Sequence, residues 1–156
     1  LVKSLAQCGV GVNAQYFSQN DLYASGPSGP LFGRRFDLIE YAMGVNGVEP
    51  PCGWFTTAEI PSASNGWIGT NVTGYKNEEY DVACRAAQLA LPGEQSYIDL
   101  YRQPQVLFAG ELPAIPLYYR MRVAAARPGI CHFDFDATAN PLWNVEAIDL
   151  GEACQN

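Results

Sequence analysis

Three prolines near residue 110 limit what this chain can fold into more than any other feature of its sequence. Pro104 lies inside a helical pattern over residues 94–112, where it should kink or restart the helix, because an interior proline loses a hydrogen bond and clashes with the preceding turn. Pro113 ends that helix, and Pro116 is tolerated only at an edge or at the start of a strand. Residues 117–126 are therefore predicted to form a strand.

A second helix is predicted just before this one. Asn77 is a suitable N-cap, acidic residues fill the first turn, where the helix dipole favours them, and Pro92 with Gly93 closes the pattern. Its apolar stripe has helical spacing and consists of Tyr80, Ala83, Cys84, Ala87 and Leu91.

Strands are predicted in the first third of the chain. Residues 1–9 are typical of a helix end closed by Gly9, and residues 10–16 then alternate as a half-buried strand does. Residues 34–43 give a second strand around Phe36, Leu38 and Ile39. The order strand, strand, helix, helix, strand predicts a single α/β domain over residues 1–156, with a mixed sheet flanked by helices.

Composition excludes some classes of partner. The net charge of −7 would repel a nucleic-acid backbone, and the nine basic residues form no cluster. The sequence has no apolar run near the roughly 20 residues that a membrane span needs. The segment 44–74 is rich in Gly, Pro, Ser, Thr and Asn, but it also holds Trp54, Phe55 and Trp67. Loops that carry aromatic residues tend to bind something.

Five cysteines are many for this length, and none has zinc-ligand spacing. Structural disulfides outside the cytosol explain them better than reduced thiols do. Our interpretation pairs Cys52 with Cys84 and Cys131 with Cys154, which leaves Cys8 free or bonded to another chain. Five buried thiols in a reduced protein are the alternative. Asn71-Val72-Thr73 is a glycosylation sequon, which matters only in a host that glycosylates secreted proteins.

Several motifs in a fixed order resemble one known family. The segment 34–43 is followed by Glu49-Pro50, then by Asn-x-x-Gly-Tyr-x-Asn-x-Glu-x-Asp at 71–81, then by Leu-Pro-x-Ile-Pro-Leu-Tyr at 112–118. From about Val10 onward the chain resembles the closing portion of bacterial extracellular solute-binding proteins of the peptide and nickel type (family 5), which serve ABC importers.

The resemblance implies a lobe of the type II periplasmic-binding-protein kind, belonging to a longer two-lobed receptor that closes on its solute. Residues from about 114 onward would return toward the other lobe. The implied partners are a peptide or small-molecule solute, the membrane permease and the missing N-terminal lobe. The implied location is extracytoplasmic, with the full-length protein anchored to the membrane, and no cofactor or metal is implied.

The resemblance also implies where the solute would bind. The strand that ends near Met43 would lead into the cleft, and Asn46 stands where peptide-binding members place an aspartate for the peptide's ammonium group. An amide cannot offset a buried ammonium, so a neutral or sugar-like solute fits better than a classical peptide. The candidate ligand-binding residues are Met43, Asn46, Trp54, Phe55, Trp67 and Tyr75.

Each candidate also has an ordinary structural interpretation. The aromatic residues could cap a core beneath a long loop, Tyr75 could pack at the start of a helix, and Asn46 could be a turn residue before Gly47. Tyr118 and Tyr119, as neighbours on a strand, would face opposite ways.

An enzyme is the first alternative function. His132 is the sole histidine and has no nucleophile elbow near it. A pair of carboxylates drawn from Glu40, Asp134 and Asp136 could hydrolyse glycosides, or the two aspartates could hold a cation. A disulfide-stabilised adhesion or structural domain is the second alternative. We favour the receptor, which has no catalytic residues.

Overall fold

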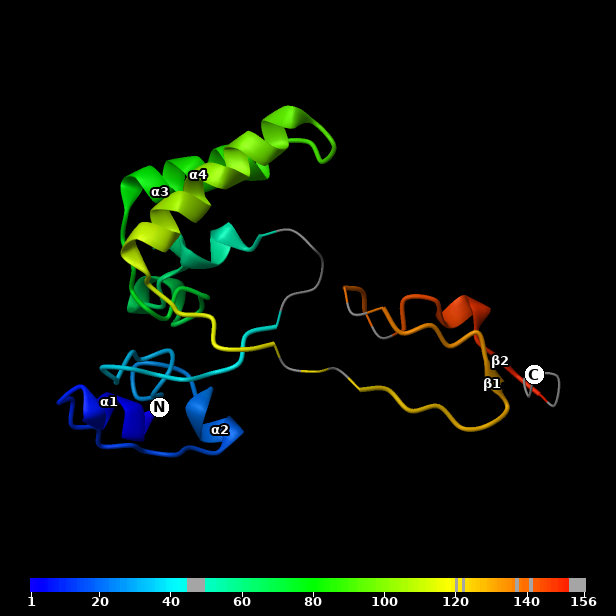
Figure 1. The fold of residues 1–156 in the computed structure, drawn as a ribbon, viewed down its shortest axis with the longest axis horizontal. Coiled ribbons are helices and arrows are strands. Elements are labelled where there is room, and N and C mark those ends of the chain that lie inside the picture. The colour runs from blue at the N-terminus through cyan, green and yellow to red at the C-terminus, as the bar shows by residue number, and fades with distance from the viewer. Residues whose placement is uncertain (45–49, 120, 122, 137, 141, 152–156) are drawn as a thin grey trace. The chain divides into compact units, whose positions relative to one another are not determined.

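The computed structural model describes residues 1–44, 50–119, 121, 123–136, 138–140 and 142–151. The chain forms two compact units (Figure 1). The first, called here the helical unit, comprises Leu1–Glu40 and Cys52–Pro113. The second, called here the C-terminal unit, comprises Tyr41–Pro51 and Ala114–Asn156. A single domain over residues 1–156 was expected, and each unit is described by itself below.

The helical unit contains two helices packed against each other, α3 (Glu78–Gln88) and α4 (Gln95–Glu111). They lie side by side in Figure 1, joined by a short loop. The Asn77 side chain accepts a hydrogen bond from the backbone N–H of Tyr80 at 3.0 Å, which confirms the predicted N-cap. From the predicted stripe of α3, Tyr80, Cys84 and Ala87 are buried, whereas Leu91 lies beyond the helix and is exposed.

Helix α4 is continuous through Pro104, so the expected restart there is wrong. Pro104 is fully buried, and its packing offsets the missing backbone hydrogen bond. The helix ends at Glu111, and Leu112 takes a left-handed conformation (φ 47°) while its N–H bonds to the Phe108 carbonyl at 2.8 Å. Pro113 follows at once, as predicted for the end of this helix.

Three short 3₁₀ helices lie in the segment before α3, and the first of them packs against it. They are η1 (Cys52–Phe55), η2 (Thr57–Glu59) and η3 (Ala63–Asn65). Phe55 meets Phe108 of α4 edge to face, with ring centroids 4.8 Å apart. The Tyr80 hydroxyl donates to the Cys52 carbonyl at 2.7 Å, which ties α3 to η1 inside the core.

The N-terminal part of the helical unit contains α1 (Val2–Gln7) and α2 (Gln19–Leu22), and the predicted strands at 10–16 and 34–43 are absent. Gly9 has φ 80°, as expected of a residue that closes a helix. Alternation makes a strand only where a second strand supplies backbone partners, and the apolar side chains of 10–16 are instead exposed, Tyr16 at 93%. These two strand predictions are wrong.

The described part of the C-terminal unit contains a two-stranded antiparallel sheet, β1 (Ile130–Cys131) with β2 (Asp149–Leu150), and the 3₁₀ helix η4 (Val145–Ala147). The described residues of 117–126 form no strand, contrary to expectation. A mixed sheet flanked by helices does not occur in the described chain, and membership of a periplasmic-binding-protein lobe stays a prediction. Within the same ranges, no helix has the length and apolar character to span a membrane.

Candidate functional site

A buried asparagine organises the segment that the sequence analysis singled out for binding. Asn71 is fully buried, and its Nδ2 lies 2.9–3.0 Å from the carbonyl oxygens of Phe55, Thr56 and Tyr75. Its Oδ1 accepts from the Thr73 hydroxyl at 2.9 Å and from the Tyr75 N–H at 3.3 Å. Because the amide nitrogen is buried and already bonded, the sequon at Asn71 is not accessible in the folded chain.

Two of the predicted ligand-binding aromatics serve the core of the helical unit. Phe55 is buried against Phe108, so its ring faces the protein interior. Tyr75 packs edge to face on Tyr80, with centroids 5.3 Å apart. Burial, followed by the nearby Glu111 carboxylate, raises the pKa of the Tyr75 hydroxyl. Both residues therefore pack as the structural interpretation in the sequence analysis described, Phe55 in the core and Tyr75 at the start of a helix.

The two tryptophans of this segment are half-buried. Trp67 has a left-handed backbone (φ 63°), and its backbone N–H donates to the Ser62 carbonyl at 2.8 Å. Its indole lies directly over Gly26, where a Cβ would run into the ring. Trp54 lies on η1, and its carbonyl accepts from the Thr70 hydroxyl at 3.1 Å.

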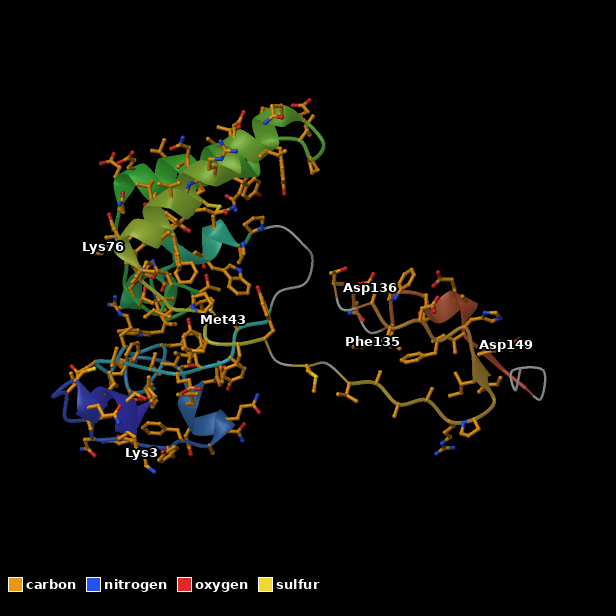
Figure 2. All side chains as sticks on the ribbon, viewed as in Figure 1. Lys3, Met43, Lys76, Phe135, Asp136 and Asp149 are labelled. Atoms are coloured by element: carbon orange, nitrogen blue, oxygen red, sulfur yellow. A yellow bond between two sulfur atoms is a disulfide. The ribbon has the colours of Figure 1, made fainter. Side chains whose placement is uncertain are left out.

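The remaining two predicted ligand-binding residues are Met43 and Asn46. Met43, labelled in Figure 2, is part of the C-terminal unit and is exposed. Asn46 lies outside the described residues. The proposed role of Asn46 in the cleft therefore stays a prediction.

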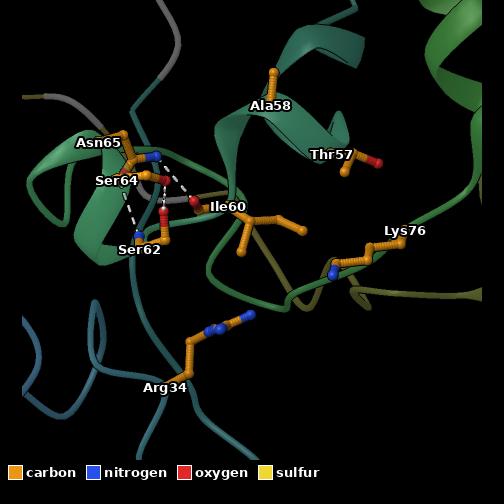
Figure 3. Close-up of a pocket in the computed structure, with 8 residues that line it drawn as sticks. All are labelled: Arg34, Thr57, Ala58, Ile60, Ser62, Ser64, Asn65 and Lys76. Carbon is orange, nitrogen blue, oxygen red and sulfur yellow. Dashed lines mark hydrogen bonds between the residues drawn. The ribbon is translucent and has the colours of Figure 1, made fainter.

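A pocket of about 380 Å³ opens beside the 3₁₀ helices of the helical unit (Figure 3). Its lining combines two cations with small polar groups: Arg34, Thr57, Ala58, Ile60, Ser62, Ser64, Asn65 and Lys76. In Figure 3 the ends of the Arg34 and Lys76 side chains turn toward each other across its lower part. Of the predicted ligand-binding residues that the structure describes, none lines this pocket.

The polar wall of this pocket is fixed by short-range hydrogen bonds. Asn65 Oδ1 accepts from the Ser62 N–H at 2.8 Å, and Asn65 Nδ2 donates to the Ile60 carbonyl at 2.9 Å. Ser62 and Ser64 hold their hydroxyl oxygens 2.8 Å apart. The Thr57 N–H donates to Asp81 Oδ1 at 2.9 Å, which joins this wall to α3.

Sequence reasoning missed the two cations. Arg34 begins the predicted strand 34–43, and Lys76, next to the predicted cap Asn77, was given no role. The sequence contained one usable signal, the polar run Ser62 to Asn65 inside a segment already marked for binding. It gave no reason to bring Arg34 next to that run, because the two are far apart along the chain.

The carboxylates of the enzyme alternative lie in both units, Glu40 in the helical unit and Asp134 and Asp136 in the C-terminal unit. Hydrogen bonds from the Thr138 hydroxyl and N–H, at 2.6 and 2.7 Å, lower the pKa of Asp136. A glycosidase acid needs a raised pKa, which is opposite to the direction of the shift at Asp136. Over the described parts of the chain, no three potential metal-ligating side chains gather.

Disulfide bonds are present in both units. Cys52 and Cys84 form a disulfide, the pairing that the sequence analysis proposed. Cys131 is also disulfide-bonded, and Cys154, its predicted partner, lies outside the described residues. Cys8 is a free, exposed thiol.

Comparison with known proteins finds no matching family, no matching curated protein and no matching solved structure.

Proposed function

We propose that this chain is part of the solute-binding component of an extracytoplasmic ABC importer, which binds an oligopeptide or a neutral, sugar-like solute in a cleft between two lobes. The support from the sequence is the order of its motifs, in which the Asn71–Asp81 pattern precedes Leu112–Tyr118 by about thirty residues. In this proposal the protein catalyses no reaction. Its function would be closure, with contacts in both lobes stabilising the shut form that the permease recognises.

One structural observation carries this proposal. The segment that follows Pro113 is extended, and its described apolar side chains are exposed by 56% to 101%: Ile115, Leu117, Tyr118, Tyr119, Met121 and Val123. Soluble proteins rarely leave such a run open to water, because burial of each large apolar side chain is worth roughly 1.5–3 kcal/mol. The proposed second lobe would cover these exposed side chains.

The Cys52–Cys84 disulfide and the hydrogen bonds of Asn71 also agree with a binding protein, although each stabilises the fold in any case. The Cys52–Cys84 disulfide and the Asn71 hydrogen bonds hold residues 52–75 in one shape with little regular secondary structure. A receptor needs such a pre-formed wall, since ordering a loop on binding reduces affinity.

The test compares the 156-residue chain with the full-length gene product that contains it. Both are screened by thermal shift against a tripeptide mixture, maltotriose and a nickel chelate. The proposal expects a shift in the longer protein that grows with ligand concentration and is absent from the shorter chain, because closure needs both lobes.

A comparable shift in the shorter chain would mean that the site is complete here, and the two-lobed receptor would be ruled out. A full-length protein that contains no second lobe would rule it out as well.

A further inference from the structure

Two positive charges face one pocket without a compensating acid. Among the described residues the one ion pair joins Arg102 to Asp99, at 3.9 Å, so neither Arg34 nor Lys76 has a carboxylate partner there. The nearby acids accept hydrogen bonds from other groups and do not line the pocket: Asp81 accepts from Thr57, Glu59 from Thr70 and Glu111 from Asn77. In a chain of net charge −7, a pocket lined by two cations and by no described acid is a local concentration of positive charge.

The position of Arg34 is built by the backbone. Arg34 has φ 51°, a left-handed conformation that is unfavourable for a residue with a Cβ. The Arg34 guanidinium lies against Gly74, where an added Cβ would be 2.5 Å from Arg34 Nη1 and the end of the arginine side chain would have to move. Gly74 itself has φ 72°, where glycine is favoured. An uncommon backbone conformation and a close approach thus place the same charged group at the pocket.

The opposite wall supplies a hydrogen-bond donor. The amide of Asn65 is occupied by Ile60 and Ser62, as described above. The hydroxyls of Ser62 and Ser64 share one hydrogen between them at 2.8 Å, which leaves the hydrogen of the accepting hydroxyl free to donate elsewhere. An acceptor between this pair and the two cations would receive bonds from three directions.

From this arrangement we infer that the pocket binds the phosphate group of a small phosphate monoester. A phosphate monoester carries close to two negative charges at pH 7 and matches two cations, whereas a carboxylate carries one. The pocket volume of about 380 Å³ exceeds what a phosphate alone would fill and leaves room for a small organic body. This inference goes beyond the solute-binding function proposed above and does not depend on it.

The test is calorimetric titration of the chain at about pH 7.5 and low salt with three matched probes: glucose 6-phosphate, gluconate and glucose. Glucose 6-phosphate should bind at least about tenfold more tightly than glucose, with gluconate between them. Arg34→Asn and Lys76→Gln should each weaken the binding of glucose 6-phosphate by about threefold to tenfold. Asparagine is chosen at position 34 because it tolerates a left-handed backbone, so the variant keeps its fold and its melting temperature.

Arg35→Gln is the matched control, since it removes one positive charge from the adjacent residue, which does not line this pocket. Its affinity should stay within about twofold of the parent chain. The inference is overturned by absence of binding at millimolar concentrations, by equal losses in all three variants, which would indicate a general field effect, or by equal affinity for gluconate and glucose 6-phosphate.

Discussion

At the scale of single residues, buried polar groups hold the helical unit in its shape. Asn71 connects three carbonyl groups from two separate stretches of chain, and Tyr80 bonds the carbonyl of Cys52. Each group has lost its contact with water, so its partner bonds must be complete. Changes at these positions should therefore cost more than changes of the same kind at exposed positions.

Asn71→Asp should destabilise the helical unit by about 3 kcal/mol or more, because it removes the N–H donors facing three carbonyls and places a carboxylate in the interior. Urea unfolding followed by far-ultraviolet circular dichroism measures the change. Asn13→Asp, at an exposed position, is the matched control and should stay within about 0.5 kcal/mol of the parent. Equal effects of the two substitutions would contradict the role of Asn71.

Tyr80 should make stability fall at alkaline pH. Burial, followed by the neighbouring Tyr75 and Asp81, raises its pKa above the ordinary 10.0. The unfolded chain loses this proton from about pH 10 upward while the folded chain keeps it, so the free energy of unfolding is undiminished below about pH 10 and falls above it.

Urea unfolding at about pH 8, 10 and 11 tests the prediction. Tyr80→Phe should be less stable than the parent at about pH 8 by about 1–2 kcal/mol, because the Cys52 carbonyl loses its donor, but should lose less stability between about pH 10 and 11. Tyr75, whose pKa is also raised, would account for the slope that remains. Parallel pH profiles for the two proteins would show that Tyr80 does not titrate as proposed.

At the scale of elements, local signals and one cross-link set the arrangement of the helices. Asn77 begins α3 and also donates to Glu111 Oε1 at 2.8 Å, so one side chain joins the start of α3 to the end of α4. The Cys52–Cys84 disulfide joins η1 to α3 across a separation of 32 residues. These contacts hold the helical pair to each other and to the loop segment beneath it.

Removing the disulfide should cost stability through the unfolded chain. The double variant Cys52→Ala/Cys84→Ala should be less stable by about 3–4 kcal/mol, the entropy of closing a loop of this length. Unfolding is followed by circular dichroism, with and without reductant. The reductant should destabilise the parent by a similar amount and leave the double variant nearly unchanged; equal sensitivity of both proteins would assign the effect to the disulfide at Cys131 instead.

The cap of α3 can be tested separately. Asn77→Ala should destabilise the helical unit by about 1 kcal/mol, because the Tyr80 N–H loses its acceptor. Asn77→Ser keeps a capping oxygen and should lie within a few tenths of a kcal/mol of the parent. Urea unfolding distinguishes them. If serine were as harmful as alanine, the bond to Glu111 rather than the cap would be the main contribution.

At the scale of the whole molecule, the two units differ in how far they bury apolar surface. The helical unit has a core around Tyr80, Cys84 and Val72, whereas the segment after Pro113 presents its apolar side chains to solvent. This difference is what the proposed second lobe would explain. It also predicts that substitutions in this segment affect stability only where a second lobe covers the segment.

The double variant Leu117→Ser/Tyr119→Ser should leave the free energy of unfolding of the present chain within about 0.5 kcal/mol, since both side chains are exposed. If the full-length protein is the two-lobed receptor proposed above, the same change there should cost about 2 kcal/mol or more, because a second lobe would bury both side chains. Unfolding of both proteins in urea provides the comparison. A neutral effect in the full-length protein would count against the receptor proposal.

Sequence by itself determined the parts of this protein that depend on neighbouring residues. Asn77, the acidic first turn and Pro113 bounded α3 and α4, because capping, dipole and proline effects act within one turn. The strand predictions at 10–16 and 34–43 were wrong. An apolar pattern shows only which side chains could be buried, whereas a strand also needs a backbone partner that no local pattern reveals. The restart at Pro104 was wrong, because the burial that holds this proline inside α4 depends on what packs against the helix.

Tertiary structure alone decided the candidate sites. It buried Phe55 against Phe108, used Asn71 as an internal hydrogen-bonding centre and brought Arg34 beside Gly74, opposite Lys76 and the serine pair. Aromatic residues in a loop suit a core and a binding surface equally well, so their sequence could not separate the two roles. The physical reason is distance along the chain: a pocket is made by contacts between remote segments, whereas helix limits are made by contacts within a few residues.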